Sequence, residues 1–155
     1  VLVAVDADAI HPHVAWSAST SHSSATTTNN RAAYHGVIAG LREVLRRGWA
    51  VEVIGDSAPI LHQLRHYQPP KNAALRPLYS EARRLADAVR VVAWHHHRRH
   101  HNRMADCAAN AAMDSRVSVQ TDHPSSWAHG ARIDSLLLSD IEEWRTRRLM
   151  HSIKE

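Results

Sequence analysis

Three aspartates of the sequence stand where a metal-binding carboxylate could be held, and two of them follow predicted strands. Asp6 comes after an apolar, β-branched run at residues 1–5, and Asp56 comes after a second apolar run at residues 50–55. Both runs are typical of buried strands. If the two strands are parallel neighbours, their carboxyl ends meet at one sheet edge and the carboxylates lie close together. Carboxylates at that distance favour a bound cation, and hard oxygen ligands suit Mg²⁺ or Mn²⁺.

Each aspartate also has a simpler interpretation. Asp56 could cap the helix that follows its strand, which explains it about as well as metal binding does. Asp6 has no helix directly after it, so capping explains it less well. The third aspartate, Asp106, is flanked by alanines on a short helix and shares a face with Asn102 at i, i+4 spacing. It is either a metal ligand or an exposed rim residue.

The rest of the pattern predicts the elements that position these groups. Asn29 and Asn30 offer N-cap side chains to a first helix, and Gly48 ends that helix. Apolar strands linked through helices predict an α/β domain whose sheet contains parallel pairs. Helices are predicted at residues 29–48, 57–67, 75–89 and 101–113, and further strands at residues 14–19 and 89–94.

The character of the sequence changes after residue 114. Residues 115–130 are polar and contain proline, as in a linker, and residues 133–149 form an amphipathic helix with the capping-box pattern Ser139-x-x-Glu142 inside it. We therefore expect a domain at residues 1–114, followed at residues 115–155 by a linker and a helix. The helix could dock on the domain or reach a partner, and docking is the simpler expectation.

Composition sets broad limits on function. The chain has 155 residues, 44% of them hydrophobic and 22% charged, and a formal charge of +4, which suits one soluble domain and a polyanionic partner. No apolar run approaches the roughly 20 residues of a membrane span, and nothing at the start of the sequence resembles a signal peptide. A single cysteine, Cys107, favours a reducing compartment, so we expect an intracellular protein of the nucleus or cytoplasm, not a secreted one. Because Val1 opens directly inside a predicted strand, we expect a piece of a longer polypeptide.

Five segments, in order, make the chain resemble the type 1 ribonuclease H family, including its reverse-transcriptase-like branch. The resemblance covers about residues 1–114. The segments are Val5-Asp6-Ala7, Thr28-Asn29-Asn30-Arg31-Ala32-Ala33-Tyr34, Ile38-Ala39-Gly40-Leu41, Val53-Ile54-Gly55-Asp56-Ser57, and Asn102-Arg103-Met104-Ala105-Asp106 with Ala109-Asn110.

The resemblance implies a fold and a reaction. The fold would be ribonuclease H-like, a mixed sheet with parallel central strands flanked by helices, with the early strands shortened. The reaction would be endonucleolytic cleavage of the RNA strand of an RNA–DNA hybrid by two divalent metal ions. Asp6, Asp56 and Asp106 would be the metal ligands, and Mg²⁺ or Mn²⁺ the cofactor.

The resemblance also implies contacts to the nucleic acid. Asn29 and Asn30 would contact the minor groove of the hybrid, where RNA exposes its 2′-hydroxyl groups. Arg99 matches a position where the family often carries a basic residue near the scissile phosphate, and Asn102 lies just after it.

The chain departs from the family pattern at one catalytic position. The family carries a glutamate on the first helix, directly before the tyrosine of the Asn-Asn motif, and here that position is Ala33. No acidic residue stands a turn away, and Asp8 is a poor substitute for the missing ligand. The segment Ala7-Asp8-Ala9-Ile10-His11-Pro12 replaces a glycine-rich turn, and little sequence between residues 14 and 28 could build two full strands. We expect weakened metal binding and a loss of orders of magnitude in rate.

A histidine-rich run, Trp94-His95-His96-His97-Arg98-Arg99-His100-His101, is the most biased segment. On a strand, His95 and His97 share one face and His96 the other. A zinc or nickel site is conceivable, but no further ligands complete a four-ligand set. A basic, solvated edge explains the run about equally well.

Three hypotheses follow from the sequence. The first is a metal-dependent ribonuclease H, weakened by Ala33. The second is a catalytically inactive nucleic-acid-binding domain that holds a hybrid without cutting it. The third is an interaction module of a larger, retroelement-type polyprotein, with the helix at residues 133–149 as the contact.

Overall fold

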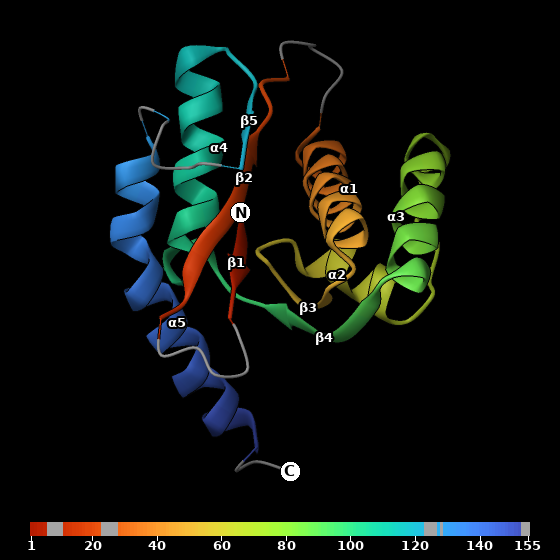
Figure 1. Ribbon diagram of the computed structural model, residues 1–155. Coiled ribbons are helices and arrows are strands. Elements are labelled where there is room, and N and C mark those ends of the chain that lie inside the picture. The colour runs from red at the N-terminus through yellow and green to blue at the C-terminus, as the bar shows by residue number, and fades with distance from the viewer. Residues whose placement is uncertain (6–10, 23–27, 123–126, 128, 153–155) are drawn as a thin grey trace. The chain divides into compact units, whose positions relative to one another are not determined.

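The computed structural model describes residues 1–5, 11–22, 28–122, 127 and 129–152 of the chain (Figure 1). The chain divides into two units. His22–Arg98 form one, the central unit. Val1–Ser21 and Arg99–Glu155 together form the other, the terminal unit.

The central unit contains a parallel strand pair and the helices that follow its strands. The strands β3 and β4 pair in parallel, with Val53 opposite Trp94, which confirms the prediction of parallel pairing in a mixed α/β fold. The helices α1 and α3 pack against each other and lie side by side in Figure 1. The elements are α1 (Asn29–Arg47), β3 (Ala50–Gly55), α2 (Ala58–Arg65), η1 (Ala73–Leu75), α3 (Arg76–Ala88) and β4 (Arg90–His96).

Both ends of the helix α1 are capped by the residues directly next to it in the sequence. Thr28 has an extended backbone, so its Oγ1 can accept a hydrogen bond from the N–H of Arg31 at 3.3 Å. Thr28 is therefore the N-cap, and the prediction that Asn29 and Asn30 cap the helix is wrong: they are its first two residues. At the other end Gly48 adopts the left-handed conformation at φ 67°, as predicted for the residue that ends this helix.

The core of the central unit comes from the inner faces of its helices, and its strands are less covered than predicted. The buried side chains of α1 and α3 repeat at helical spacing, as the sequence indicates. The side chains of β3 and β4 are half-buried or exposed, and none of them is fully buried, contrary to the prediction. The buried hydrophobic residues of this core are Tyr34, Ile38, Leu41, Val44, Ile60, Leu61, Leu64, Leu75, Tyr79, Ala82, Leu85, Ala86 and Val89.

The terminal unit contains an antiparallel sheet in the order β1-β2-β5, covered by two long helices. The predicted linker at residues 115–130 includes a strand, β5, which pairs with β2 so that Ala18 lies opposite Gln120. The early strand β1 is three residues long. The elements are β1 (Leu2–Ala4), β2 (His13–Ser19), η2 (Arg99–His101), α4 (Arg103–Ser115), β5 (Val119–Thr121) and α5 (Gly130–Ser152).

The helix α5 contributes half of the buried cluster of the terminal unit. Its side chains pack against α4 and β2, the docked arrangement that the sequence favours, and Figure 1 shows α5 alongside α4. None of the described helices has the length and apolar character of a membrane span. The buried cluster consists of Val14, Met104, Ala108, Ile133, Leu137 and Ile141.

Candidate functional site

The parallel strand pair of the central unit brings Asp56 to the carboxyl end of a strand. Asp56 directly follows β3 and its side chain is exposed. The N–H of His97 donates to the carbonyl of Gly55 at 2.9 Å, so the ladder extends to the point where Asp56 leaves the sheet. The N-cap residue of α2 is Ser57, one position further on, so the alternative role of Asp56 as the cap of that helix is not supported. This strand end is where α/β proteins bind ligands.

The histidine run lies next to this edge of the strand pair. His95 Nε2 lies 3.1 Å from Glu52 Oε2, on the neighbouring strand. The rings of His95 and His97 are 6.2 Å apart, whereas His96 is exposed, in agreement with the predicted alternation. Among the described residues, no group of three or more His, Cys, Asp or Glu side chains could hold a metal ion, and the zinc or nickel alternative gains no support.

The first turn of α1 presents amides and no carboxylate. Asn29 and Asn30 are exposed there, and Ala33 is half-buried one position before the buried Tyr34. The carboxylate of Glu43, on the same helix, stands ten residues after Ala33, which is about 15 Å along the axis. It could not reach the position that Ala33 occupies.

Glu43 is also fully engaged where it stands. Its Oε1 accepts from Arg46 Nη2 and from Arg47 Nε, each at 2.6 Å. The hydrogen bond from Arg46 is the main cause that holds the pKa of the Glu43 carboxyl below its usual range, against the opposing effect of burial. The residue therefore stabilises the end of α1 and is not a substitute ligand.

The helix α4 of the terminal unit carries Asp106 near its start. The side chain is half-buried, and Oδ2 accepts a hydrogen bond from Asn110 Nδ2 at 3.2 Å. The backbone N–H of Asp106 donates to the carbonyl of Asn102 at 3.2 Å and closes the first turn. Asn102 is buried, whereas Arg99, in η2, is exposed. Of the two predicted substrate contacts here, Arg99 is the accessible one.

A buried carboxylate that the sequence does not single out lies on α5. Asp140 is 0% exposed, and its Oδ2 accepts from the N–H of Met104 at 2.8 Å. The signal that could have identified it is its place on the apolar stripe of α5, between Leu137 and Ile141. The capping-box pattern Ser139-x-x-Glu142 lies in the interior of α5, inside the helix as expected, and does not start a helix there.

The segment before α4 is held by a small polar cluster. His101 Nδ1 lies 2.9 Å from Glu143 Oε1, and the indole N–H of Trp144 donates to the carbonyl of His101 at 2.8 Å. His101 Nε2 also contacts the guanidinium of Arg147. Partial burial lowers the pKa of His101 below its ordinary value, Arg147 adds to that effect, and Glu143 opposes it.

The predicted ligands, each taken by itself, have the donor chemistry that suits a hard divalent cation. Asp56 and Asp106 offer carboxylate oxygens on accessible or half-buried side chains, the ligands that Mg²⁺ and Mn²⁺ prefer. Asp56 belongs to the central unit and Asp106 to the terminal unit. Asp6, the third predicted ligand, lies outside the described residues.

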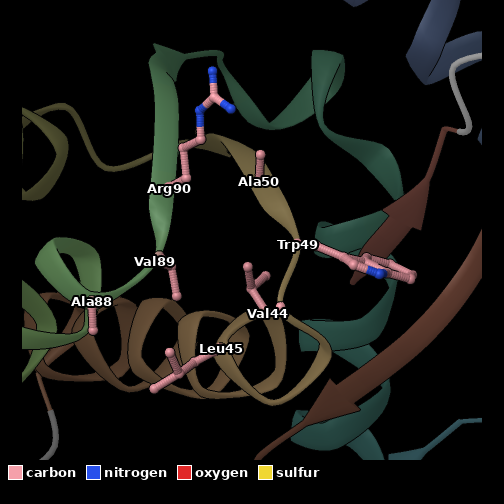
Figure 2. A pocket seen from close by; sticks show the side chains of 8 residues that line it. Val44, Leu45, Trp49, Ala50, Ala88, Val89 and Arg90 are labelled. Carbon is pink, nitrogen blue, oxygen red and sulfur yellow. The ribbon is translucent and has the colours of Figure 1, made fainter.

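A pocket of the central unit lies at the opposite end of the strand pair from Asp56. Its volume is about 340 Å³, and it adjoins Ala50 and Arg90, the first residues of β3 and β4. Figure 2 shows the side chain of Trp49 extending away from the others. The pocket is therefore separate from Asp56. Its lining residues are Val44, Leu45, Gly48, Trp49, Ala50, Ala88, Val89 and Arg90.

Comparison with known proteins identifies relatives over most of the chain. Residues 11–112 match the family described as reverse transcriptase-like. A bifunctional protein of Mycobacterium tuberculosis and an uncharacterized protein of Mycobacterium bovis are each 35% identical over 120 residues, covering 68% of this chain. The chain spans about a third, 32%, of the length of these curated relatives.

A solved structure shares the fold. The crystal structure of ribonuclease H1 from the halophilic archaeon Halobacterium salinarum is similar to this chain with a TM-score of 0.50 and 33% sequence identity. The similarity covers 57% of this chain and 68% of that one.

Proposed function

Because the chain belongs to the reverse transcriptase-like family and contains a ribonuclease H-type domain, we propose that it cleaves the RNA strand of RNA–DNA hybrids. The observation that carries the proposal is the position of Asp56 at the carboxyl end of β3, next to the parallel strand β4. A carboxylate at this place, in a family of this fold, suits a divalent-metal site that faces a nucleic-acid backbone.

In this proposal Asp6, Asp56 and Asp106 hold Mg²⁺ or Mn²⁺. Bound divalent metal would activate a water molecule and stabilise the leaving oxygen of the scissile phosphodiester. The protein's own contribution is to fix the carboxylates. The ladder between β3 and β4 places Asp56, and the first turn of α4 places Asp106.

In this proposal the hybrid contacts residues that the sequence predicts to bind the substrate. Asn29 and Asn30 are exposed at the start of α1, where their amides can contact the minor groove and its 2′-hydroxyl groups. Arg99 is exposed just before α4 and can approach a phosphate. Asn102 is buried, so its role would be to shape the turn that precedes Asp106.

A second candidate function, binding of a hybrid without cleavage, is favoured by one observation. Ala33 occupies the position at which the resemblance implies a catalytic glutamate. The nearest carboxylate that follows on the same helix, Glu43, is held by Arg46 and Arg47. A site with three carboxylates would bind metal less tightly and cleave slowly or not at all.

The test is cleavage of an end-labelled RNA–DNA hybrid by the purified chain in Mg²⁺ or Mn²⁺. We expect slow cleavage of the RNA strand, lost by at least about 100-fold in Asp56→Asn and in Asp106→Asn, as for removal of a ligand in a metal site. The matched control is Asp114→Asn, because Asp114 is an exposed aspartate near the other end of α4.

The outcomes separate the two candidate functions. Cleavage that depends on Asp56 and Asp106, but not on Asp114, establishes the hydrolase. Retention of the hybrid in a binding assay with no cleavage in either metal establishes the binding domain instead. Cleavage that survives both substitutions would mean that these aspartates are not the metal ligands.

A further inference from the structure

The helix α5 caps the start of α4 from a distance. Met104 is the second residue of α4, so its N–H is one of those that a helix leaves without an intrahelical partner. The side chain of the N-cap residue, Asn102, makes no capping hydrogen bond. Asp140 of α5 accepts the hydrogen bond in its place at 2.8 Å, although it lies 36 residues further along the chain. The cap of α4 is therefore supplied by another helix.

The charge of Asp140 is balanced at the same place. The first residue of α4, Arg103, directs Nε toward Asp140 Oδ1 at 3.4 Å and donates from Nη2 to Ser139 Oγ at 2.7 Å. A carboxylate at a helix N-terminus is stabilised by the helix dipole, and a neighbouring guanidinium offsets part of the cost of burying it. Asp140 thus joins the two helices through their backbone and side chains.

The apolar contacts of α5 fix its register on α4. Leu137 and Ile141 flank Asp140 along the helix and belong to the same buried cluster as Met104 and Ala108. Figure 1 shows the two helices side by side. A shift of α5 along α4 would remove the carboxylate from the Met104 N–H and leave both groups buried without a partner, which is costly.

The turn held in this way is the one that carries Asp106. Asp106 comes two residues after Met104, and its own N–H closes the turn onto Asn102. We propose that Asp140 is a positioning residue that sets the place of the Asp106 carboxylate for divalent metal. The proposal rests on the proposed function, and it gives α5 a part in the site although the family match ends at residue 112.

The test compares Asp140→Ala and Asp140→Asn with Asp134→Ala in the full chain. Asp134 is the matched control because it is an exposed aspartate on the same helix. The first measurement is broadening of the Asp106 amide signal in ¹H–¹⁵N spectra during a Mn²⁺ titration. The second is the Mg²⁺ concentration that gives half-maximal cleavage of a saturating RNA–DNA hybrid.

We expect Asp140→Ala to raise both metal requirements by about tenfold, as for the loss of a group that orients a metal ligand. The affinity for the hybrid should change much less, because Asp140 is 0% exposed and so cannot contact the hybrid directly. Asp140→Asn keeps the shape and one acceptor oxygen but loses the charge, so we expect a smaller rise. Asp134→Ala should match the wild type.

Each outcome decides the proposal. Unchanged metal requirements in a folded Asp140→Ala chain overturn it. If that variant does not fold, Asp140→Asn decides, since unchanged Mn²⁺ broadening there overturns the proposal and a raised requirement supports it. If the wild-type chain binds Mn²⁺ at Asp106 but does not cleave the hybrid, the proposed hydrolase function is wrong. The positioning role of Asp140 is then tested by the Mn²⁺ titration alone. A wild-type chain without Mn²⁺ broadening at Asp106 overturns both.

Discussion

The two helix starts that carry candidate functional residues, those of α1 and α4, are capped in different ways. The start of α1 is capped by Thr28, the residue directly before it, through a 3.3 Å hydrogen bond on the protein surface. The start of α4 is capped by Asp140, a fully buried residue of another helix, through a 2.8 Å hydrogen bond. One cap needs only its own turn, whereas the other exists only after two helices have packed.

The difference between the two caps shows which helix start depends on tertiary packing. A local cap acts whenever the helix forms, so the turn with Asn29 and Asn30 is independent of distant contacts. Because the remote cap comes from another helix, the stability of the turn with Asp106 depends on the packing of α5 on α4. Three substitutions and a change of pH test this contrast, and their expected effects decrease in that order.

The largest effect is expected for removal of the remote cap. Asp140→Ala leaves the N–H of Met104 buried without a partner, so the free energy of opening of α4 should fall by about 2–3 kcal/mol. Amide hydrogen exchange, read residue by residue, checks this. The amides of α1 serve as the internal control and should keep their protection. An equal loss of protection in both helices would contradict the contrast.

The second prediction restores a carboxylate to the α1 side. Ala33→Glu should increase the rate of hybrid cleavage at fixed Mg²⁺ by about tenfold or more, because it would add a fourth oxygen ligand to the proposed metal site. The rate is measured with an end-labelled hybrid. Ala32→Glu, one position earlier on the same helix, is the control and should give no gain. A rate that does not rise in Ala33→Glu would show that this position is not the missing ligand.

A smaller effect is expected for removal of the local cap. Thr28→Ala should lower the free energy of opening of the first turns of α1 by about 1 kcal/mol, because an exposed N-cap hydrogen bond is worth about that much. Hydrogen exchange of the amides near Arg31 is the measurement. Thr28→Ser, which keeps the hydroxyl, should behave like the wild type, and the amides of α4 should not respond in either variant.

The smallest effect concerns pH and the segment before α4. The pKa of His101 is lowered from its ordinary value of 6.5, so the fold favours the neutral ring. The stability that this provides is fully present above pH 6.5 and is lost as the pH falls through the lowered pKa. Glu143, whose pKa is lowered mainly by its hydrogen bond from Arg147, adds a separate loss below its own ordinary value of 4.5.

The measurement for this last prediction is the pH dependence of α4 hydrogen exchange, together with an NMR titration of the His101 ring. The other charged groups that act on the ring are Arg147, Arg103 and His100. His101→Gln should flatten the response between about pH 5 and 7, where histidine titrates. A response that persists in this variant would assign it to another group.

The sequence is most informative where a signal is local and repeated. The apolar spacing of residues 75–89 predicts α3 almost to its ends, and Gly48 marks the end of α1 because only its backbone accepts a positive φ easily. At the start of α1, three consecutive polar residues, Thr28, Asn29 and Asn30, could each act as the cap. The extended backbone of Thr28 decides between them, and that is a property of the folded chain.

The features that the sequence does not predict depend on distant partners. The strand β5 is three residues long and mostly polar, and it becomes a strand because it pairs with β2. In the sequence, Asp140 looks like any other acidic residue of an amphipathic helix. Its capping role becomes visible only when α4 packs against α5. The proposed ligand set also depends on residues that are distant in sequence, because Asp56 and Asp106 are fifty residues apart.

The division of the chain also orders events during synthesis. The central unit, His22–Arg98, is continuous in sequence, so all of its residues have been made before synthesis reaches α4. The terminal unit combines Val1–Ser21 with a segment that includes α5, so it cannot be completed before α5 has been made. A product truncated before Gly130 would lack Asp140, leaving α4 without its cap and its apolar cover. Under the proposed role of Asp140, chains truncated before this residue would therefore bind divalent metal poorly at Asp106.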